Sequence, residues 1–201
     1  MRLSVIVPTL GRPTLQRTLE SIAPQVIHGD EVIVVSDGPI PGVQEIVTSM
    51  GACFRYLEGP LTRQWGHEQR NAGMRVASGD YLAFIDDDDW YVKEAFSAVR
   101  ETIGAEREKL FLFRIEYMGR LIWSTREVVA ENICTTIALV PNRRDLPRWR
   151  LGMFNGGRGG DFLFCREVLE VLPESRPVWV DRFIAAGDRV GNGVVAAAHG
   201  R

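Results

Sequence analysis

Lysine is scarce in this chain of 201 residues. Only Lys93 and Lys109 are lysines among 24 basic residues, and the other 22 are arginines. Arginine suits phosphate recognition, but a GC-rich genome produces the same skew, so the skew alone assigns no function. Acidic residues number 26 and the net charge is −2, so no overall basic field points to nucleic acid or an anionic membrane.

Cysteines and long apolar runs are also few. Cys53, Cys134 and Cys165 are odd in number and widely spaced, which favours a reduced setting over a disulfide framework. No apolar run approaches the 18 residues of a membrane span. The run at residues 3–7 is too short for a signal peptide and ends at Pro8. We therefore expect a cytoplasmic protein; peripheral membrane association stays open.

Alternating strand and helix patterns dominate the first half of the chain. With 45% apolar side chains, the sequence can bury one sizeable core, and we expect a single domain over residues 1–201. Helical apolar spacing separates short β-type runs, an alternation that predicts a parallel sheet with right-handed crossovers. The expected strands are residues 3–7, 31–36, 53–57 and 81–85.

The pattern changes after about residue 104. Three β-type runs at 110–117, 121–124 and 135–140 are separated by short turns, which is more typical of antiparallel strands. A glycine loop at 155–160, a helix and a strand at 178–184 follow. The glycines and small residues of 187–201 predict a mobile tail.

Four consecutive aspartates, residues 86–89, follow the strand expected at 81–85. Adjacent carboxylates repel one another, and the usual reason to tolerate them is a divalent cation with oxygen ligands. Ligands of open α/β sheets bind beyond the carboxyl ends of strands, where this cluster falls. The alternative is a solvated acidic loop that caps the next helix. The position favours a metal site.

Three motifs in this region occur in a fixed order: Arg70-Asn71-Ala72-Gly73, Gly79-Asp80-Tyr81 and Asp86-Asp87-Asp88. Together they resemble the Arg-Asn-x-Gly, Gly-Asp/Glu-Tyr and Asp-x-Asp elements of GT-A glycosyltransferases, particularly family 2. An Asp-x-Asp motif alone is a weak signal, whereas the order and spacing of all three are specific. The resemblance extends from about residue 2 to 184 and is thinner after residue 90.

The resemblance implies a GT-A fold, an α/β fold with a Rossmann-like, mostly parallel sheet and a small antiparallel section on the acceptor side. Residues 1–104 would form the nucleotide-sugar-binding half and 105–186 the acceptor half. The implied reaction moves a sugar from a nucleoside diphosphate sugar to an acceptor hydroxyl, with inversion. Such a displacement needs a general base on the acceptor and a cation, Mn²⁺ or Mg²⁺, on the leaving diphosphate.

The loops after the first two strands carry the implied nucleoside site. Pro8, Thr9 and Arg12 match the Pro-Thr-x-x-Arg segment that lines the base and ribose in the family. Asp37 matches an aspartate that accepts a hydrogen bond from the base; alternatively it only turns the chain. Ser36 replaces the family's usual first aspartate, which leaves the base preference open.

Within the acidic run, the resemblance implies distinct roles. Asp86 would contact the ribose, and Asp88 would be the direct metal ligand. Asp87 occupies the variable position of the motif, within the donor site. Asp89 is expected to cap a helix that begins near Trp90.

Arg70 is expected to reach the diphosphate because a guanidinium fork matches phosphate oxygens. The alternative is an exposed arginine at the start of a helix expected at about residues 71–77. Trp65 and His67 lie in a polar loop and are candidates for a closing lid, although a histidine in such a loop is usually only solvated.

Asp161 is the candidate catalytic base, because family 2 enzymes carry an acidic motif at the start of a late helix. Gly160 stands where a first acid is often found, and the alternative for Asp161 is an N-cap. Asp181 is a competitor within an expected strand. His199 resembles C-terminal histidines that bind metal in some GT-A enzymes. Because it lies in a tail of small residues, we expect no functional role for it.

Two other classes remain. A nucleotidyltransferase usually has a glycine-rich basic loop after its first strand, which residues 8–13 lack, and would release pyrophosphate. A non-catalytic sugar-nucleotide-binding protein would bind without turnover. The aspartates do not fit an Asp-nucleophile phosphatase or an EF-hand. The sugar, the base, the acceptor and the oligomeric state are not specified by the sequence.

Overall fold

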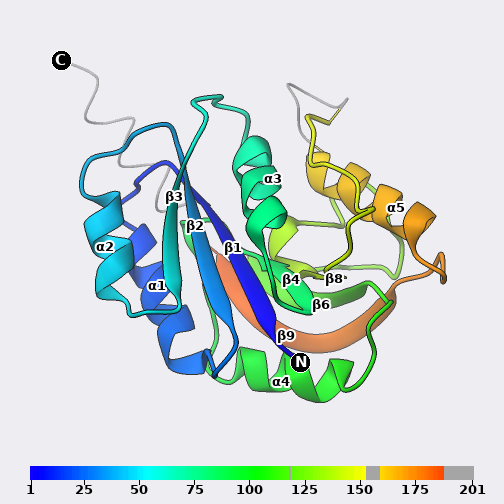
Figure 1. Cartoon of the computed structure of the whole chain (residues 1–201). Coiled ribbons are helices and arrows are strands. Elements are labelled where there is room, and N and C mark those ends of the chain that lie inside the picture. Colours follow the sequence, from blue (N-terminus) through cyan, green and yellow to red (C-terminus); the bar gives the residue numbers. More distant parts are fainter. Residues whose placement is uncertain (118, 153–158, 188–201) are drawn as a thin grey trace.

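The first four long apolar runs form the parallel part of one sheet (Figure 1). The computed structural model describes residues 1–117, 119–152 and 159–187. Every residue of the two innermost strands is buried, as expected where helices cover both faces. In spatial order these strands are β3 (Phe54–Gly59), β2 (Glu31–Asp37), β1 (Leu3–Thr9) and β4 (Tyr81–Phe84), all parallel.

Helices cover both faces of these strands. α1 (Leu15–Ile22) and α2 (Val43–Ser49) lie on one side and α3 (His67–Val76) on the other (Figure 1). On α1 the side chains of Leu15, Leu19 and Ile22 are buried, which is the spacing of one helical face. Because β1, β2 and β4 run parallel, their carboxyl ends lie at one edge of the sheet.

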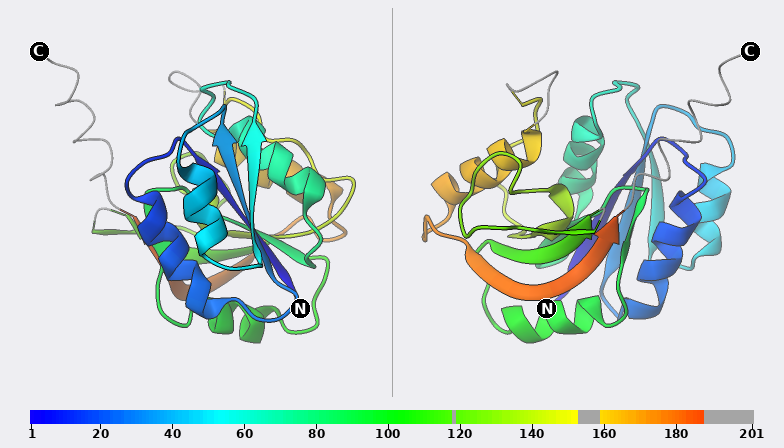
Figure 2. Two further views of the ribbon diagram at one scale, coloured as in Figure 1. Left: turned by 60° about the vertical axis from the view of Figure 1, so that its left-hand side comes forward. Right: turned by 180° about the vertical axis from the view of Figure 1, so that it is seen from behind.

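The second half of the chain extends the same sheet. Beyond β4 the order is β8 (Ala138–Pro141), β6 (Phe111–Tyr117), β9 (Val178–Gly187) and β5 (Asp89–Tyr91), and β7 (Arg120–Ile122) pairs with β6. Most of these pairings are antiparallel, but β6 and β9 run parallel. α4 (Ala95–Ile103) and α5 (Gly160–Val171) flank this half, and β9 bends strongly around it (Figure 2).

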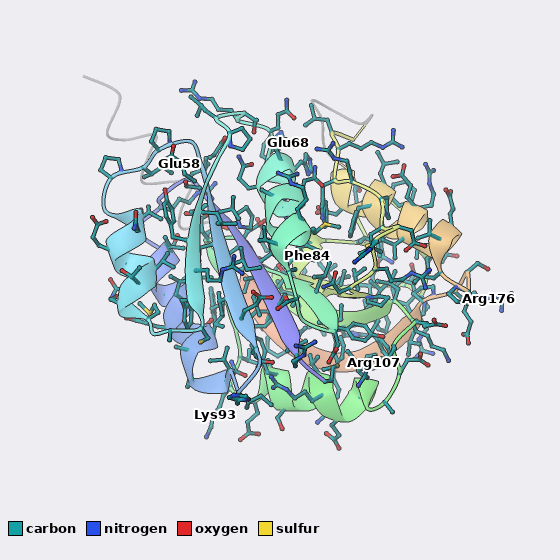
Figure 3. All side chains as sticks on the ribbon, in the orientation of Figure 1. Glu58, Glu68, Phe84, Lys93, Arg107 and Arg176 are labelled. Carbon is teal, nitrogen blue, oxygen red and sulfur yellow. The ribbon has the colours of Figure 1, made fainter. Side chains whose placement is uncertain are left out.

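The apolar core is continuous across both halves. Phe84, in the middle of the molecule, is fully buried and packs against Trp149 and Phe164 at centroid distances of 5.2 and 5.8 Å. Charged side chains such as Lys93, Arg107 and Arg176 project at the periphery (Figure 3). The aromatic contacts join α5 to β4, so the two halves share one core.

Two of the expected elements differ from the structure in ways that matter for the cavity. The helix expected at 71–77 begins four residues earlier, at His67. The strand expected at 135–140 is a 3-10 turn, η2 (Thr135–Ile137), followed by β8. In a continuous strand Thr135 and Thr136 would point to opposite faces, whereas here both hydroxyls donate to carboxylates of one cavity. A second short 3-10 helix, η1 (Ala23–Gln25), follows α1.

Some predictions fall outside the described residues: most of the glycine loop at 155–158, the tail after 187 and His199. Among the helices of the described part, none combines the length and apolarity that a membrane crossing requires.

Candidate active site

A cavity of about 650 Å³ opens at the carboxyl ends of the parallel strands. The loops after β1, β2 and β4 form one wall, which we call the parallel wall, and η2 with α5 forms the opposite wall, the antiparallel wall. Of the site residues expected from the sequence, the cavity is lined by Pro8, Thr9, Arg12, Asp37, Asp86, Asp87, Asp88 and Asp161. The lining does not include Asp181, whose exposed carboxylate pairs with Arg114 on β6.

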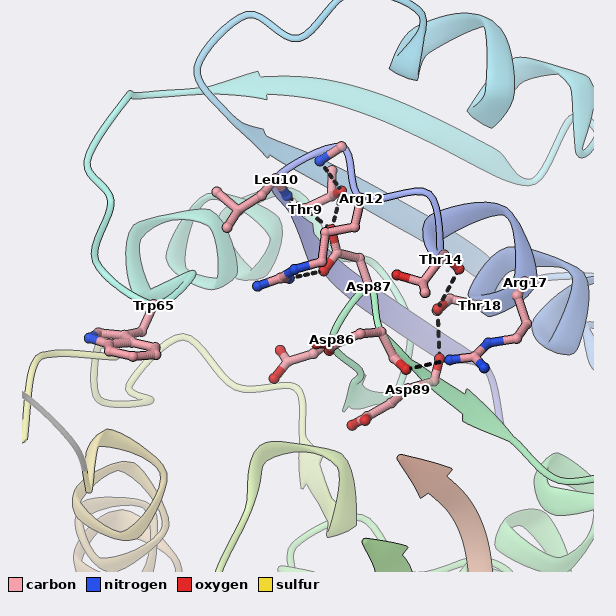
Figure 4. A network of polar contacts seen from close by, with 12 residues as sticks. Thr9, Leu10, Arg12, Thr14, Arg17, Thr18, Trp65, Asp86, Asp87 and Asp89 are labelled. Carbon is pink, nitrogen blue, oxygen red and sulfur yellow. Dashed lines mark hydrogen bonds and ion pairs between the residues drawn. The ribbon is translucent and has the colours of Figure 1, made fainter. Parts of the chain in front are cut away.

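Asp87 organises the loop after β1 (Figure 4). Its carboxylate, only 1% exposed, accepts hydrogen bonds from the Thr9 hydroxyl (2.6 Å) and the Leu10 backbone N–H (3.0 Å) and forms an ion pair with Arg12. Asp87 and Arg12 were both expected to bind the donor. The structure shows them bound to each other, which fixes the loop between β1 and α1 against the end of β4.

Arg70 lies inside the molecule, so the alternative of an exposed helix-start arginine is wrong. The residue is 2% exposed, and its guanidinium pairs with Asp86 and donates to the Trp65 carbonyl oxygen at 2.8 Å. Its planar group also lies 5.0 Å from the ring centroid of Trp149. Arg70 is not among the residues that line the cavity, but its partner Asp86 is.

Asp37 holds the loop that follows β3. Its carboxylate accepts from the backbone N–H groups of Thr62 (2.6 Å) and Arg63 (2.8 Å) and from the Gln69 side-chain amide (2.9 Å). The residue is 5% exposed and still borders the cavity. Asp37 therefore does more than turn its own chain, because it fixes a loop 25 residues away.

Asp88 and Asp89 carry poorly compensated charge. Burial raises the pKa of Asp88, and the neighbouring carboxylates of Asp86 and Asp87 raise it further, while Arg12 opposes them. Burial also raises the pKa of Asp89, whose carboxylate accepts from the Thr136 hydroxyl at 3.0 Å. The expected helix cap at Asp89 is wrong: the residue starts β5, which pairs with β9, and the next helix begins only at Ala95.

Asp161 faces this cluster from the first turn of α5. Gly159 is the N-cap of that helix, so the alternative role of Asp161 as an N-cap is wrong. The carboxylate accepts from the Thr135 hydroxyl at 2.7 Å. Burial raises its pKa, while the positive charge of Arg70 opposes the shift. A carboxylate with a raised pKa is a stronger base than one in water.

His67 is buried rather than solvated in a loop, which corrects the expectation for this residue. Its ring stacks on Trp149 with centroids 6.1 Å apart and lies against Gly160 at the start of α5. A Cβ at position 160 would approach the imidazole to 2.4 Å, so a glycine is required there. Burial, with the positive charge of Arg70, lowers the pKa of His67 to about 4.

Comparison with known proteins identifies this arrangement. The family model of glycosyl transferase family 2 matches residues 4–172. The chain belongs to this family. The match covers both walls of the cavity, including all four aspartates and Asp161.

Relatives of the chain carry related descriptions. An uncharacterized glycosyltransferase of Haemophilus influenzae is 29% identical over 147 residues, which cover 70% of this chain and 49% of the relative. GalNAc(5)-diNAcBac-PP-undecaprenol beta-1,3-glucosyltransferase of Campylobacter jejuni is 30% identical over 104 residues, which cover 50% of this chain and 34% of the relative. The chain thus spans half or less of the length of these relatives.

The fold is similar to that of solved structures of S. aureus TarS. The complex of TarS 1-349 with UDP-GlcNAc superposes with a TM-score of 0.74 at 19% identity, covering 94% of this chain and 59% of that one. The complex with UDP gives a TM-score of 0.71. The expected GT-A fold of this family 2 chain is confirmed.

The aspartates of this family 2 chain fit a divalent cation that is only partly held by protein. Among residues 1–117, 119–152 and 159–187, no three acidic, histidine or cysteine side chains form a ready-made cage. Asp88, however, borders the cavity, and its surroundings disfavour its ionised carboxylate. A bound cation would instead stabilise the ionised carboxylate. Mg²⁺ or Mn²⁺ typically takes one or two carboxylates and completes its shell with substrate phosphates and water.

Several lining residues were missed by the sequence reasoning. Thr135 and Thr136 bring hydroxyls to Asp161 and Asp89, and Gln69 supports Asp37. Gln69 directly precedes the Arg70 motif, so its position gave a signal. Nothing in the sequence indicated Thr135 and Thr136, because the pairing of β8 with β4 is what brings η2 to the cavity.

Proposed function

We propose that this family 2 domain transfers a sugar from a nucleoside diphosphate sugar to an acceptor hydroxyl, with inversion and with a divalent cation. The observation that carries the proposal is that one cavity is lined by Asp88 on one wall and by Asp161 on the opposite wall. Asp88, beside the fixed loops of the parallel wall, suits the donor diphosphate. Asp161, on the antiparallel wall, suits an acceptor.

Each group has a defined task in such a displacement. Asp161 accepts the proton of the attacking hydroxyl, and its raised pKa strengthens it for this role. The Thr135 hydroxyl orients the carboxylate by donating to its Oδ1 atom at 2.7 Å. Asp86, fixed by Arg70, borders the place of the ribose. When bound at Asp88, the cation would neutralise charge on the leaving diphosphate.

The test of this proposal is metal-dependent donor binding. We expect uridine diphosphate or another nucleoside diphosphate to bind much more tightly with Mn²⁺ or Mg²⁺ than with chelator, because phosphate oxygens complete the shell. Asp88→Asn should remove most of that enhancement. Titration calorimetry measures both affinities, and incubation with a panel of nucleotide sugars measures product formation.

Asp145→Asn is the matched control, since Asp145 is an exposed carboxylate paired with Arg143 and does not line the cavity. Equal affinity with metal and with chelator would contradict the metal role. Tight, metal-dependent binding without turnover of any donor would indicate a binding protein, and release of pyrophosphate from a nucleoside triphosphate would indicate a nucleotidyltransferase.

A further inference from the structure

Trp65 is a large apolar side chain left in solvent at the mouth of the cavity. It is 64% exposed, although tryptophan is among the residues that gain most from burial. Its backbone has φ +54°, a left-handed conformation that is an outlier for a bulky residue. Such a conformation persists only where its surroundings impose it, and it points to a functional reason.

Three contacts impose this conformation. The Trp65 carbonyl oxygen accepts a hydrogen bond from Arg70, whose other terminal nitrogen pairs with Asp86. Gly66, with φ +75°, lets the chain pass so close to Pro8 that a Cβ would lie 2.8 Å from it. Asp37 holds the same loop by the backbone N–H groups of Thr62 and Arg63. The loop is thus anchored at both ends.

A second apolar side chain borders the cavity from the neighbouring loop. Leu10 is 53% exposed, and Figure 4 shows Leu10 and Trp65 on two loops around the open space beside Asp86. The loops follow β1 and β3, with Asp37 at the end of β2 between them. Two exposed apolar groups with a polar rim form a place for a flat, apolar-faced ligand.

We propose that Trp65 is an aromatic platform on which the base of the nucleoside diphosphate stacks, with Asp37 and Arg70 as its positioning residues. This inference rests on the proposed function. The transferred sugar must lie between Asp88 and Asp161, near the antiparallel wall. Trp65 lines the cavity together with Leu10 and Asp37, from the loops and strand ends of β1 to β3, whereas Asp161 lines it from α5. The aromatic end of the donor, rather than its sugar, therefore meets the indole.

The experiment compares ligands with and without a base. Uridine diphosphate, guanosine diphosphate and inorganic pyrophosphate are titrated, each with Mg²⁺, into the wild type, Trp65→Ala, Trp65→Phe and Leu61→Ala. Leu61 is the matched control, because it is 65% exposed in the same loop but does not line the cavity. Trp65 is itself mostly exposed, so its replacement should leave the melting temperature nearly unchanged.

For the nucleotide that the wild type binds, Trp65→Ala should raise Kd by about 5- to 150-fold, the range expected for loss of one base–aromatic stack. Its pyrophosphate Kd should not change, Trp65→Phe should retain most of the affinity, and Leu61→Ala should resemble the wild type. Nucleotide binding should also quench part of the tryptophan fluorescence in the wild type but not in Trp65→Ala.

Unchanged nucleotide affinity in Trp65→Ala, or an equal loss for pyrophosphate, would overturn the platform while leaving metal-dependent donor binding intact. A change confined to the KM of an acceptor would also overturn it, in favour of an acceptor contact. Failure of the wild type to bind any nucleotide would overturn the proposed function and the platform together.

Discussion

The two walls of the cavity use their carboxylates differently. On the parallel wall Asp87 pairs with Arg12, Asp86 pairs with Arg70, and Asp37 accepts from two backbone N–H groups. On the antiparallel wall a threonine hydroxyl is the partner of Asp161. An arginine neutralises a carboxylate, whereas a hydroxyl only orients it.

The difference separates positioning from reactivity. Ion pairs fix the loops of the parallel wall before any ligand arrives, and this preorganisation lowers the cost of binding. Burial raises the pKa of Asp161, and the positive charge of Arg70 only partly offsets this rise, so this carboxylate keeps its affinity for a proton. A variant on one wall should therefore change stability or binding, and a variant on the other should change chemistry.

The largest expected effect is on the antiparallel wall. Asp161→Asn keeps the size of the side chain but removes its basicity, so transfer should fall by about 10²–10⁴-fold while metal-dependent donor binding is retained. In the wild type the rate should rise with pH as Asp161 loses its proton, at a pH above the usual range of aspartate. Product formation across pH measures both effects.

Asp181→Asn is the control for this experiment. Its carboxylate is an exposed partner of Arg114, and an exposed ion pair contributes little. Near-normal transfer by Asp161→Asn, or a loss of transfer only in a folded Asp181→Asn, would show that the base is elsewhere.

A smaller effect, on stability, is expected on the parallel wall. Asp87→Ala leaves Arg12 without its partner and frees the Thr9 hydroxyl and the Leu10 N–H. We expect the free energy of unfolding to fall by about 3 kcal/mol, the lower end for a broken buried pair, because Arg12 keeps 25% of its side chain exposed. Urea unfolding measures this change.

The exposed pair of Arg143 and Asp145 provides the comparison, and Asp145→Ala should unfold like the wild type. If Asp87→Ala were as stable as the wild type but lost donor binding, Asp87 would be a ligand-binding residue rather than a support of the loop.

The third effect, a pH dependence of stability, lies at His67, where α3 meets the start of α5. Its folded-state pKa of about 4 is below the usual 6.5, so the folded protein binds fewer protons than the unfolded chain between these values. This contribution to stability is complete above pH 6.5 and is lost as the pH falls toward 4, by less than about 1.4 kcal/mol per pH unit. Urea midpoints at several pH values measure it.

His67→Phe keeps a ring to stack on Trp149 but cannot titrate. The decline of stability between pH 6.5 and 4 should be shallower in this variant than in the wild type. If stability fell equally with pH in both proteins, His67 would be protonated in the folded protein without cost. The contact between α3 and the start of α5 would then be open to water.

Much of the parallel wall could be predicted from the sequence. Apolar runs of strand length specified β1, β2 and β4, and parallel strands end at a common edge, so Asp37 and Asp86 were expected together. The interactions among these residues could not be predicted. Arg12 and Asp87 are 75 residues apart, and nothing in local periodicity indicates that they pair with each other.

The start of β5 and the contact between α3 and α5 were less predictable for the same reason. Asp89 was read as a helix cap because aspartate favours that position, but pairing with β9 outweighs the local preference and makes the residue the start of a strand. His67 was read as solvated because its neighbours in sequence are polar. Trp149, which buries it, is far away in the chain.

The pairing of β5 with β9 also has a consequence for folding. Asp89 and Gly187 are opposite each other in this ladder, and nearly one hundred residues separate them. During synthesis β1 to β4 can pair as soon as they emerge, whereas β5 can contact α1, where the Thr18 hydroxyl donates to the Asp89 carbonyl oxygen, but gains its strand neighbour with β9. Closing so long a loop is slow compared with local pairing. The sheet pairing at the end of the acidic run is therefore completed late, and a chain that stops before β9 would hold Asp89 through α1 but without its strand partner.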